Sequence, residues 1–460
     1  MSLKTICAVA ACKLTRSTLR VLKRGGTALP GKAARVFDPE VLRSVSRGME
    51  IIVVTGTNGK TTTCGMLVNA LKESGRECLA NRSGANLLSG VTAELTCNAT
   101  WTGKPKTHYA VIECDEGALK QVAPLINPKV IVVTNLFRDQ LDRYGEVMHT
   151  LDELRKGVKG VPDSILCLNA DDSLTGSLAG DVSNRVVYYG MDTPVGDQKD
   201  PALSDAKYCI RCGAEYRYHY HTYAHLGGYY CPKCGYSRPD ADVAITGISQ
   251  MTAQGSRCSL RIAQENAPQT EMEMSVGLPA VYNLYNAAAA VSAYTAFGLP
   301  SSEIIDSLAT VHSSFGRMEN FTLGETPLQM ILVKNPAGCT QALEYLAAIG
   351  KPYRAVFCLN DRTADGHDIS WIWDADYEKI CGDENLRGIL VAGDRAEDMQ
   401  LRLKYAGADT DRIRLVREPK DTLDWIRESD VPVFALPNYT SMLELRDAVR
   451  KETGAKEFWE

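Results

Sequence analysis

Residues 49–63 of the chain read MEIIVVTGTNGKTTT, and this stretch decides the fold around it. The apolar residues 51–54 predict a buried strand, Gly56 and Gly59 predict a turn, and the spacing of residues 66–72 predicts a helix. Such a strand, turn and helix start cradle phosphate, because small residues let backbone N–H groups approach the oxyanion and the helix N-terminus adds positive potential. The predicted nucleotide-binding residues are Gly56, Thr57, Asn58, Gly59, Lys60, Thr61 and Thr62.

Two side chains of this motif carry specific chemistry. Lys60 can reach the β- and γ-phosphates of a nucleotide, and the Thr61 hydroxyl can bind Mg²⁺. The motif departs from the general P-loop, because Val54 stands where that pattern has its first glycine. The alternative interpretation is a glycine turn that only joins a strand to a helix.

The composition is that of an ordinary globular protein. The chain has 460 residues, a hydrophobic fraction of 45% and a formal net charge of −5, and its length suggests about three domains. The net charge gives no argument for nucleic-acid binding. The sequence has no run of roughly 18 apolar residues, so no transmembrane helix is predicted. The 15 cysteines are an odd number, and most are scattered through apolar segments. This favours free thiols in a reducing cytosol, and we expect a cytoplasmic protein.

The N-terminus has a short apolar core at residues 6–12, followed by basic residues. A secretory signal has the opposite polarity. The pattern predicts a basic amphipathic helix that either packs on the body of the protein or touches a membrane surface. Packing is the simpler interpretation, and residues 1–48 are assigned to it.

Four cysteines differ from the rest. Cys209 and Cys212 form one CxxC pair, and Cys231 and Cys234 form another, with 18 residues between the pairs. This is the spacing of a four-cysteine zinc ribbon. A complete set of four thiolates leaves no open position, so the predicted Zn²⁺ site is structural, with a redox dithiol pair or chance as the alternatives. Tyrosines between the pairs predict an aromatic β-hairpin, and His219, His221 and His225 are predicted to be surface residues and not ligands.

Strands and helices alternate through most of the chain, which predicts an α/β fold with a parallel, doubly wound sheet. The ribbon interrupts this pattern at 205–238, and residues 242–274 predict antiparallel strands. A second α/β pattern predicts a C-terminal, Rossmann-like domain. The expected domains are therefore 49–317, which binds nucleotide and carries the ribbon, and 318–460. The strands expected before the ribbon are 109–113, 129–134, 164–169 and 185–189, and those of the C-terminal domain are 329–333, 353–359, 388–391 and 432–436.

Glu113 closes one of these strands. A carboxylate at the carboxyl end of a parallel strand lies at the ligand crevice of the sheet, where it can complete a Mg²⁺ shell with Thr61. The alternative is a strand end in solvent.

Five features together resemble the Mur ligases and the folylpolyglutamate synthetases. They are GTNGKTTT at 56–63, Glu113, TNLFRDQLDRYG at 134–145, YNLYNAA at 282–288 and FGRME at 315–319. Their order and spacing match from about residue 49 to 320. The resemblance implies that ATP activates a carboxylate as an acyl phosphate, which an amine then attacks.

More narrowly, the whole chain is similar to the MurT family, the Mur-ligase-like subunits of enzymes that amidate D-glutamate in lipid II. The features are the four-cysteine insert, GGTALPGK at 25–32, NDRTADGHDISWIWDAD at 360–376 and LPNYTSMLE at 436–444. The resemblance implies an ATP-dependent carbon–nitrogen ligase of peptidoglycan synthesis. It would be the synthetase subunit of a heterodimeric amidotransferase that converts the α-carboxylate to D-isoglutamine, with peripheral contact through lipid II at the inner face of the membrane.

The resemblance also implies a GatD-like glutaminase partner that supplies ammonia. Cys339 lacks the surroundings of a nucleophile elbow. The family contributes an aspartate to the partner's Cys–His pair, and Asp368 is our choice, with Asp365 and Asp361 behind it. Trp371 and Trp373 would suit an interface anchor. The alternative is that these acids cap a helix starting near Ser370.

Other residues are carried over from the family. Asn283 and Asn286 match its adenine-contacting asparagines, although they could equally cap a helix. Arg317 matches a hinge arginine that reaches ATP phosphate, and Asn335 stands where many Mur ligases bind ribose.

Two departures put a second magnesium site in doubt. Gln140 occupies the place of a loop histidine that helps to bind this metal in Mur ligases. Many of those enzymes also use a carbamylated lysine after the loop, and Lys156 and Lys159 are out of register with it.

Two other classes remain open. A stand-alone Mur or folylpolyglutamate-type ligase would add an amino acid without a glutaminase. A nucleic-acid-binding ATPase is suggested only by the ribbon, and the sequence pI of about 5.9 argues against it.

Overall fold

The computed structural model describes residues 2–22, 28–81, 84–139, 147–196, 198, 205–252, 254–263, 269–311 and 317–454. By its internal contacts the chain divides into two units. Unit 1 comprises residues 1–136 and 148–311, and unit 2 comprises residues 137–147 and 312–460. None of the described helices is long and apolar enough to cross a bilayer.

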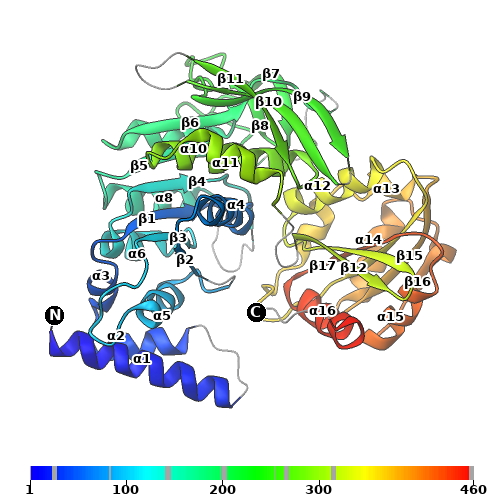
Figure 1. Cartoon of the computed structure of the whole chain (residues 1–460). Helices are drawn as coiled ribbons and strands as arrows, with labels where there is room; N and C mark the ends of the chain where they lie inside the picture. Colours follow the sequence, from blue (N-terminus) through cyan, green and yellow to red (C-terminus); the bar gives the residue numbers. More distant parts are fainter. Residues whose placement is uncertain are drawn as a thin grey trace. The chain divides into compact units, whose positions relative to one another are not determined.

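Unit 1 is built on a nine-stranded sheet with the order β11-β10-β9-β6-β5-β4-β1-β3-β2 (Figure 1). The strands are β1 (Glu50–Thr55), β2 (Cys78–Ala80), β3 (Tyr109–Glu113), β4 (Val130–Val133), β5 (Ile165–Asn169), β6 (Val186–Met191), β9 (Val243–Thr252), β10 (Gly255–Ile262) and β11 (Thr270–Val276). In the order of this sheet, the neighbouring strands from β9 through β6, β5, β4, β1 and β3 to β2 pair in parallel. The predicted parallel sheet and its four strands before the ribbon are confirmed.

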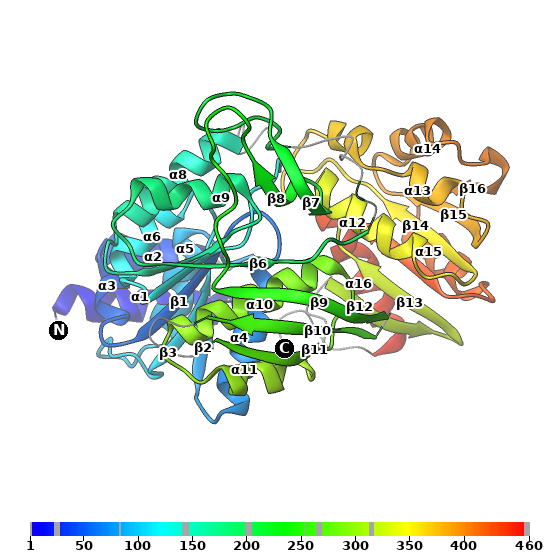
Figure 2. The same ribbon diagram turned by 90° about the horizontal axis from the view of Figure 1, so that it is seen from above.

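The antiparallel strands expected after the ribbon are also confirmed, because β9 and β11 both pair with β10 in antiparallel register. They lie side by side in Figure 2, while the ribbon hairpin of β7 (Arg217–Tyr223) and β8 (Leu226–Tyr230) forms a separate two-stranded sheet. The pairing of β9 with β6 makes the antiparallel strands part of the main sheet, which the sequence did not indicate.

The helices of unit 1 are α1 (Leu3–Val21), α2 (Leu29–Phe37), α3 (Val41–Val45), α4 (Lys60–Glu73), α5 (Leu88–Asn98), α6 (Leu119–Ile126), α8 (Val147–Lys159), α9 (Ser173–Ser177), α10 (Val281–Ala296) and α11 (Ser301–Leu308). α10 packs on β4, β5, β6 and β9, and also on α4 and α11. α1 packs on α2 and α5 (Figure 1). The starts of α4 and α10 are thereby held close to the carboxyl ends of the central strands.

Unit 2 has a six-stranded sheet with the order β12-β13-β17-β14-β15-β16. Its strands are β12 (Arg317–Leu323), β13 (Thr326–Ile331), β14 (Tyr353–Cys358), β15 (Leu386–Ala392), β16 (Ile413–Leu415) and β17 (Val433–Pro437), and its helices are α12 (Pro336–Ala347), α13 (Glu378–Cys381), α14 (Ala396–Tyr405), α15 (Pro419–Arg427) and α16 (Tyr439–Thr453). The four strands predicted here are confirmed, whereas β12 and β16 were not predicted.

Candidate functional site

The phosphate cradle lies between the end of β1 and the start of α4. Gly56 and Gly59 have φ angles of +115° and +87°, which L side chains rarely adopt. A Cβ at Gly59 would lie 2.1 Å from Oδ1 of Asn286, and a Cβ at Gly56 would lie 2.9 Å from the carbonyl oxygen of Asn135. Both glycines are therefore required by the backbone and by their neighbours.

Lys60 is the first residue of α4, and its ammonium group is held inside the cradle. It donates to the carbonyl of Gly56 and, at 3.2 Å, to that of Thr57. Its Nζ also pairs with Glu116 at 3.3 Å, and both side chains are about nine-tenths buried. Glu116 was missed from the sequence, although its position just after β3 was a signal. The lysine charge is thus fixed between the carbonyls of the loop and the carboxylate of Glu116.

Thr61 and Glu113 lie together at the mouth of the cradle. The Thr61 hydroxyl donates to Oε2 of Glu113 at 2.8 Å, and Nδ2 of Asn86 donates to Oε1 at 3.4 Å. Glu113 is only 6% exposed, so the interpretation as a solvated strand end is wrong. A hydroxyl and a buried carboxylate at this distance are a ligand pair that fits Mg²⁺.

Asn135, directly after β4, braces the same loop. Its side-chain oxygen accepts from the N–H of Asn58 at 2.9 Å, and its carbonyl accepts from the N–H of Thr57 at 2.8 Å. The sequence placed this residue in the segment 134–145 without giving it a role. The structure makes it a support of the loop.

Asn283 and Asn286 lie in the first turns of α10 and are buried. Nδ2 of Asn286 donates to Oδ1 of Asn283 at 3.2 Å, and Nδ2 of Asn283 donates to the carbonyl of Pro279 at 2.6 Å. The helix N-cap is Ala280, which makes no side-chain cap, so neither asparagine occupies the capping position. Asn286 instead lies against Gly59 of the cradle.

The four ribbon cysteines form one cluster. The ligand atoms of Cys209, Cys212, Cys231 and Cys234 all lie within 4.8 Å of one another. The Sγ atoms of Cys209 and Cys234 are 3.6 Å apart, and those of Cys212 and Cys231 are 3.4 Å apart. Zn–S bonds of about 2.3 Å in a tetrahedron require sulfur–sulfur distances of about 3.8 Å. The cluster therefore fits a tetrahedral Zn²⁺ ion.

Tyr216, Tyr229 and Tyr236 pack beside two of these cysteines and form a small aromatic core. The predicted aromatic hairpin is confirmed, but the prediction for the histidines is only partly right. His219 is exposed, whereas His221 and His225 are buried. Nε2 of His225 lies 3.4 Å from Asp172, because the hairpin folds back on the loop after β5.

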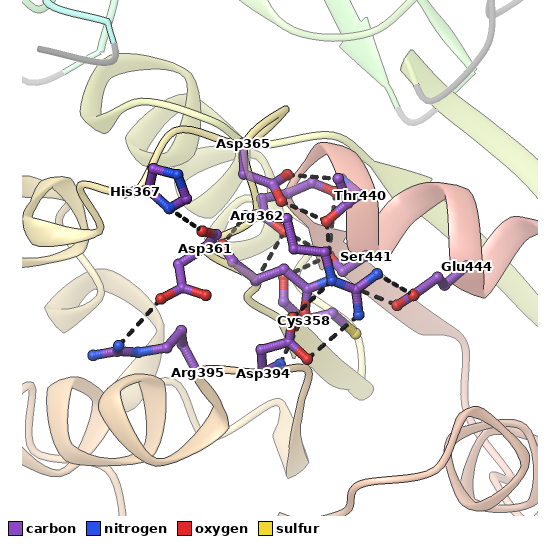
Figure 3. A network of polar contacts seen from close by, with 12 residues as sticks. Cys358, Asp361, Arg362, Asp365, His367, Asp394, Arg395, Thr440, Ser441 and Glu444 are labelled. Carbon is purple, nitrogen blue, oxygen red and sulfur yellow. Dashed lines mark hydrogen bonds and ion pairs between the residues drawn. The ribbon is translucent and has the colours of Figure 1, made fainter. Parts of the chain in front are cut away.

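The three candidate aspartates lie in unit 2 and have different surroundings (Figure 3). Asp365 is buried, and its carboxylate accepts from the N–H and the hydroxyl of Thr440 at the start of α16. Asp361 pairs with Arg395 at 3.2 Å, and its carbonyl contacts Nδ1 of His367 at 2.7 Å. Asp365 is thus engaged in holding a helix.

Asp368 is half-buried, and its Oδ1 accepts from the N–H of Ser370 at 2.8 Å. Ser370 begins a short 3-10 helix, Ser370–Asp374, whose N-cap residue is Ile369, so Asp368 bonds the first N–H of the helix from the position before the cap. This bond uses one carboxylate oxygen. Trp373 nearby is 47% exposed and packs edge-on against Tyr405.

The remaining candidates have varied positions. Asn335 is the N-cap of α12, and its Oδ1 accepts from the N–H of Gly338 at 2.8 Å. Arg317 begins β12, and its side chain lies outside the described structure. Cys339 is fully buried, and burial raises its pKa to about 12, which does not suit a nucleophile.

Of the residues that depart from the Mur ligase pattern, only the two lysines lie in the described part of the chain. Gln140 lies outside the described residues. Lys156 is 62% exposed on α8 and pairs with Glu153 at 2.8 Å, and Lys159 on the same helix is exposed.

Comparison with solved structures gives the class of this fold. A pseudomurein peptide ligase type C from Methanothermus fervidus has a TM-score of 0.64 at 21% identity, over 90% of this chain and 80% of that one. Folylpolyglutamate synthase from Mycobacterium tuberculosis has a TM-score of 0.63 at 15% identity, over 97% and 99% of the two chains. The Mur ligase middle domain model matches residues 54–211. The fold is that of the Mur ligases.

Comparison with curated proteins gives a narrower family assignment. The chain is 36% identical to the lipid II isoglutaminyl synthase (glutamine-hydrolyzing) subunit MurT of Streptococcus pneumoniae, over 98% of this chain and all of that one. It is 32% identical to the protein of the same name from Staphylococcus aureus, over 96% and 97%. The MurT ligase C-terminal model matches residues 332–442. The chain therefore belongs to the MurT family, and it is an enzyme subunit of the ligase class in cell-wall synthesis.

Proposed function

We propose that this chain is the synthetase subunit that amidates the α-carboxylate of D-glutamate in lipid II to D-isoglutamine. ATP would phosphorylate the carboxylate, and ammonia from a GatD-like glutaminase would displace phosphate from the acyl phosphate. The names of the two full-length relatives supply the substrate and the glutamine-hydrolysing reaction. The observation that carries the proposal for this chain is the cradle, where Lys60, Thr61 and Glu113 converge.

The residues of the cradle have separate roles in this proposal. The N–H groups of residues 56–62 and the α4 N-terminus would bind the phosphates. Lys60 would stabilise negative charge on the transferred phosphoryl group, and its present carbonyl partners show that it reaches across the whole loop. Asn286, whose Oδ1 lies 2.1 Å from the position that a Cβ of Gly59 would take, would face the nucleotide from α10.

Thr61 and Glu113 would hold Mg²⁺, which neutralises phosphate charge when it is bound. Arg317 and Asn335 remain nucleotide-binding candidates from family resemblance. The Cys209, Cys212, Cys231 and Cys234 cluster would hold a structural Zn²⁺ ion, because four sulfurs complete its coordination.

The partner would be needed because the chain must receive its ammonia. Cys339 is buried and lies against Tyr377, so it is not available as the thiolate of a glutaminase. Asp368 would orient the histidine of the partner, as the third member of a triad does. It is favoured over Asp365, whose two oxygens are both engaged by Thr440.

The test is a Lys60→Ala substitution in the complex with the glutaminase, with Lys420→Ala as the control. Lys420 is exposed at the start of α15. Amidation of lipid II should fall at least about 100-fold in Lys60→Ala, the scale for losing one preorganised charge at a transition state, and should not change in the control.

Amidation at the wild-type rate by folded Lys60→Ala complex would refute the proposal. Turnover of ATP with a free amino acid by the chain alone would instead favour a stand-alone ligase.

A further inference from the structure

Helix α1 carries apolar side chains on two opposite faces. Thr5, Ala8, Val9 and Cys12 are buried on the face that packs on α2 and α5. Leu3, Ile6, Leu14 and Val21 are 77%, 39%, 63% and 83% exposed. At about 100° per residue these four fall within roughly 80° of arc, on the side away from the buried face. We call these four residues the exposed stripe.

The exposed stripe has an unusual charge environment for this chain. α1 contains Lys4, Lys13, Arg16 and Arg20 and no acidic residue, although the chain as a whole has a net charge of −5. Arg16 pairs with Glu94 at 3.1 Å. Lys4 and Arg20 are exposed. The second apolar face of α1 therefore lies on a strongly basic helix.

An exposed tryptophan lies beside this helix. Trp101, in the loop after α5, is 61% exposed, and Nζ of Lys13 lies 4.8 Å from the centre of its ring. A cavity of about 430 Å³ is lined by Leu14 of the exposed stripe, by Arg20 and by Trp101. Apolar, cationic and aromatic groups thus border one opening. Tryptophan and lysine are the side chains that favour the headgroup level of a bilayer.

We propose that the exposed stripe of α1 docks on a bilayer of anionic phospholipid, with Lys13, Arg20 and Trp101 at the level of the headgroups. Charge complementarity selects this occupant, because most of a chain with net negative charge is repelled by an anionic surface and α1 is attracted to it. A short stripe gives weak, reversible binding. This docking does not depend on recognition of a lipid-linked substrate, so it goes beyond the proposed function.

The first test uses vesicles that contain no cell-wall precursor. Full-length protein is sedimented with phosphatidylcholine vesicles and with vesicles that contain about one quarter phosphatidylglycerol, a content that gives a negative surface potential. Binding should be at least about fivefold greater on the anionic vesicles and should fall in about 0.5 M NaCl, because salt screens the attraction. Equal binding to the two kinds of vesicle, or none to either, would overturn the proposal.

The second test asks whether the exposed stripe is the surface involved. Leu14→Gln with Val21→Gln should reduce binding to anionic vesicles at least about fivefold. Met251→Gln, at an exposed apolar residue on β9, should not. These side chains are exposed, so the circular dichroism melting curves of both variants should match that of the wild type. Unchanged vesicle binding by the double variant would assign the surface elsewhere.

The charges and the tryptophan give independent measurements. Lys4→Gln with Arg20→Gln should lose the preference for anionic vesicles, whereas Lys351→Gln with Lys420→Gln, at exposed residues of unit 2, should keep it. Trp101→Phe should abolish the blue shift of tryptophan emission on binding. If the exposed stripe mediates dimerisation instead, the wild type and the Leu14→Gln, Val21→Gln double variant will differ in molecular mass in solution without lipid. That result would overturn the proposal.

Discussion

At the scale of single residues, Asp361, Asp365 and Asp368 are distinguished by what already occupies their carboxylates. Thr440 engages both oxygens of Asp365, and Arg395 pairs with Asp361. Asp368 uses Oδ1 for the N–H of Ser370. The sequence could place these acids in one segment. The sequence could not show that Thr440 donates hydrogen bonds to Asp365, because Thr440 is 75 residues away along the chain.

Asp368 is therefore expected to affect the glutaminase reaction specifically. Asp368→Asn keeps an oxygen for the Ser370 N–H but removes the charge that would orient a histidine. Glutamine hydrolysis by the complex should fall at least about 100-fold, while nucleotide binding to the chain stays unchanged.

The matched control is Asp361→Asn, which loses only the ion pair with Arg395, where both side chains are about one-third exposed. Its effect on glutamine hydrolysis should be small. If Asp361→Asn lost hydrolysis and Asp368→Asn kept it, the assignment would pass to Asp361.

At the scale of elements, local patterns predicted most strands, and they failed where pairing is long-range or the strand is short. β2 and β16 have only three residues each, too few for a periodic pattern. The ribbon cysteines were found because their spacing is local. The buried positions of His221 and His225 were not, because they depend on packing against the rest of unit 1.

A buried ion pair fixes the base of the ribbon to the rest of unit 1. Asp171 follows β5, and its carboxylate accepts from Nε of Arg238 at 2.6 Å, from the N–H of Met191 at 2.9 Å, and from the Tyr285 hydroxyl. Burial raises the pKa of Asp171, and the Arg238 charge opposes this. Tyr285 lies between Asn283 and Asn286 on α10, so the same carboxylate connects the ribbon base to the helix beside the cradle.

Arg238→Gln should consequently destabilise unit 1. The substitution leaves the fully buried Asp171 without its cation, and breaking a buried pair costs about 3–5 kcal/mol. Urea unfolding followed by circular dichroism measures this change, with Arg257→Gln, at an exposed residue of β10, as the control. Zinc content should be retained, because the four cysteines are untouched. If the free energy of unfolding falls by less than about 1 kcal/mol, the Arg238–Asp171 pair contributes no more than an ordinary surface ion pair.

At the scale of the whole molecule, the two units carry different candidate sites. Unit 1 holds the cradle and the cysteine cluster, and unit 2 holds the aspartate segment and the exposed Trp373. The fold class and the cradle residues could be predicted from sequence, because each rests on a strand end or a local motif. The sequence could not show that β9 extends the main sheet or that residues 137–139 group with unit 2.

In the proposed reaction, a carboxylate is activated by phosphorylation in the cradle. The decisive experiment uses lipid II whose D-glutamate α-carboxylate carries oxygen-18, incubated with the complex, MgATP and glutamine. We predict that the label appears in the released inorganic phosphate in an amount equal to the amidated product, because an acyl phosphate passes one carboxylate oxygen to phosphate. Amidation with all of the label in AMP, or with none in phosphate, would contradict the account.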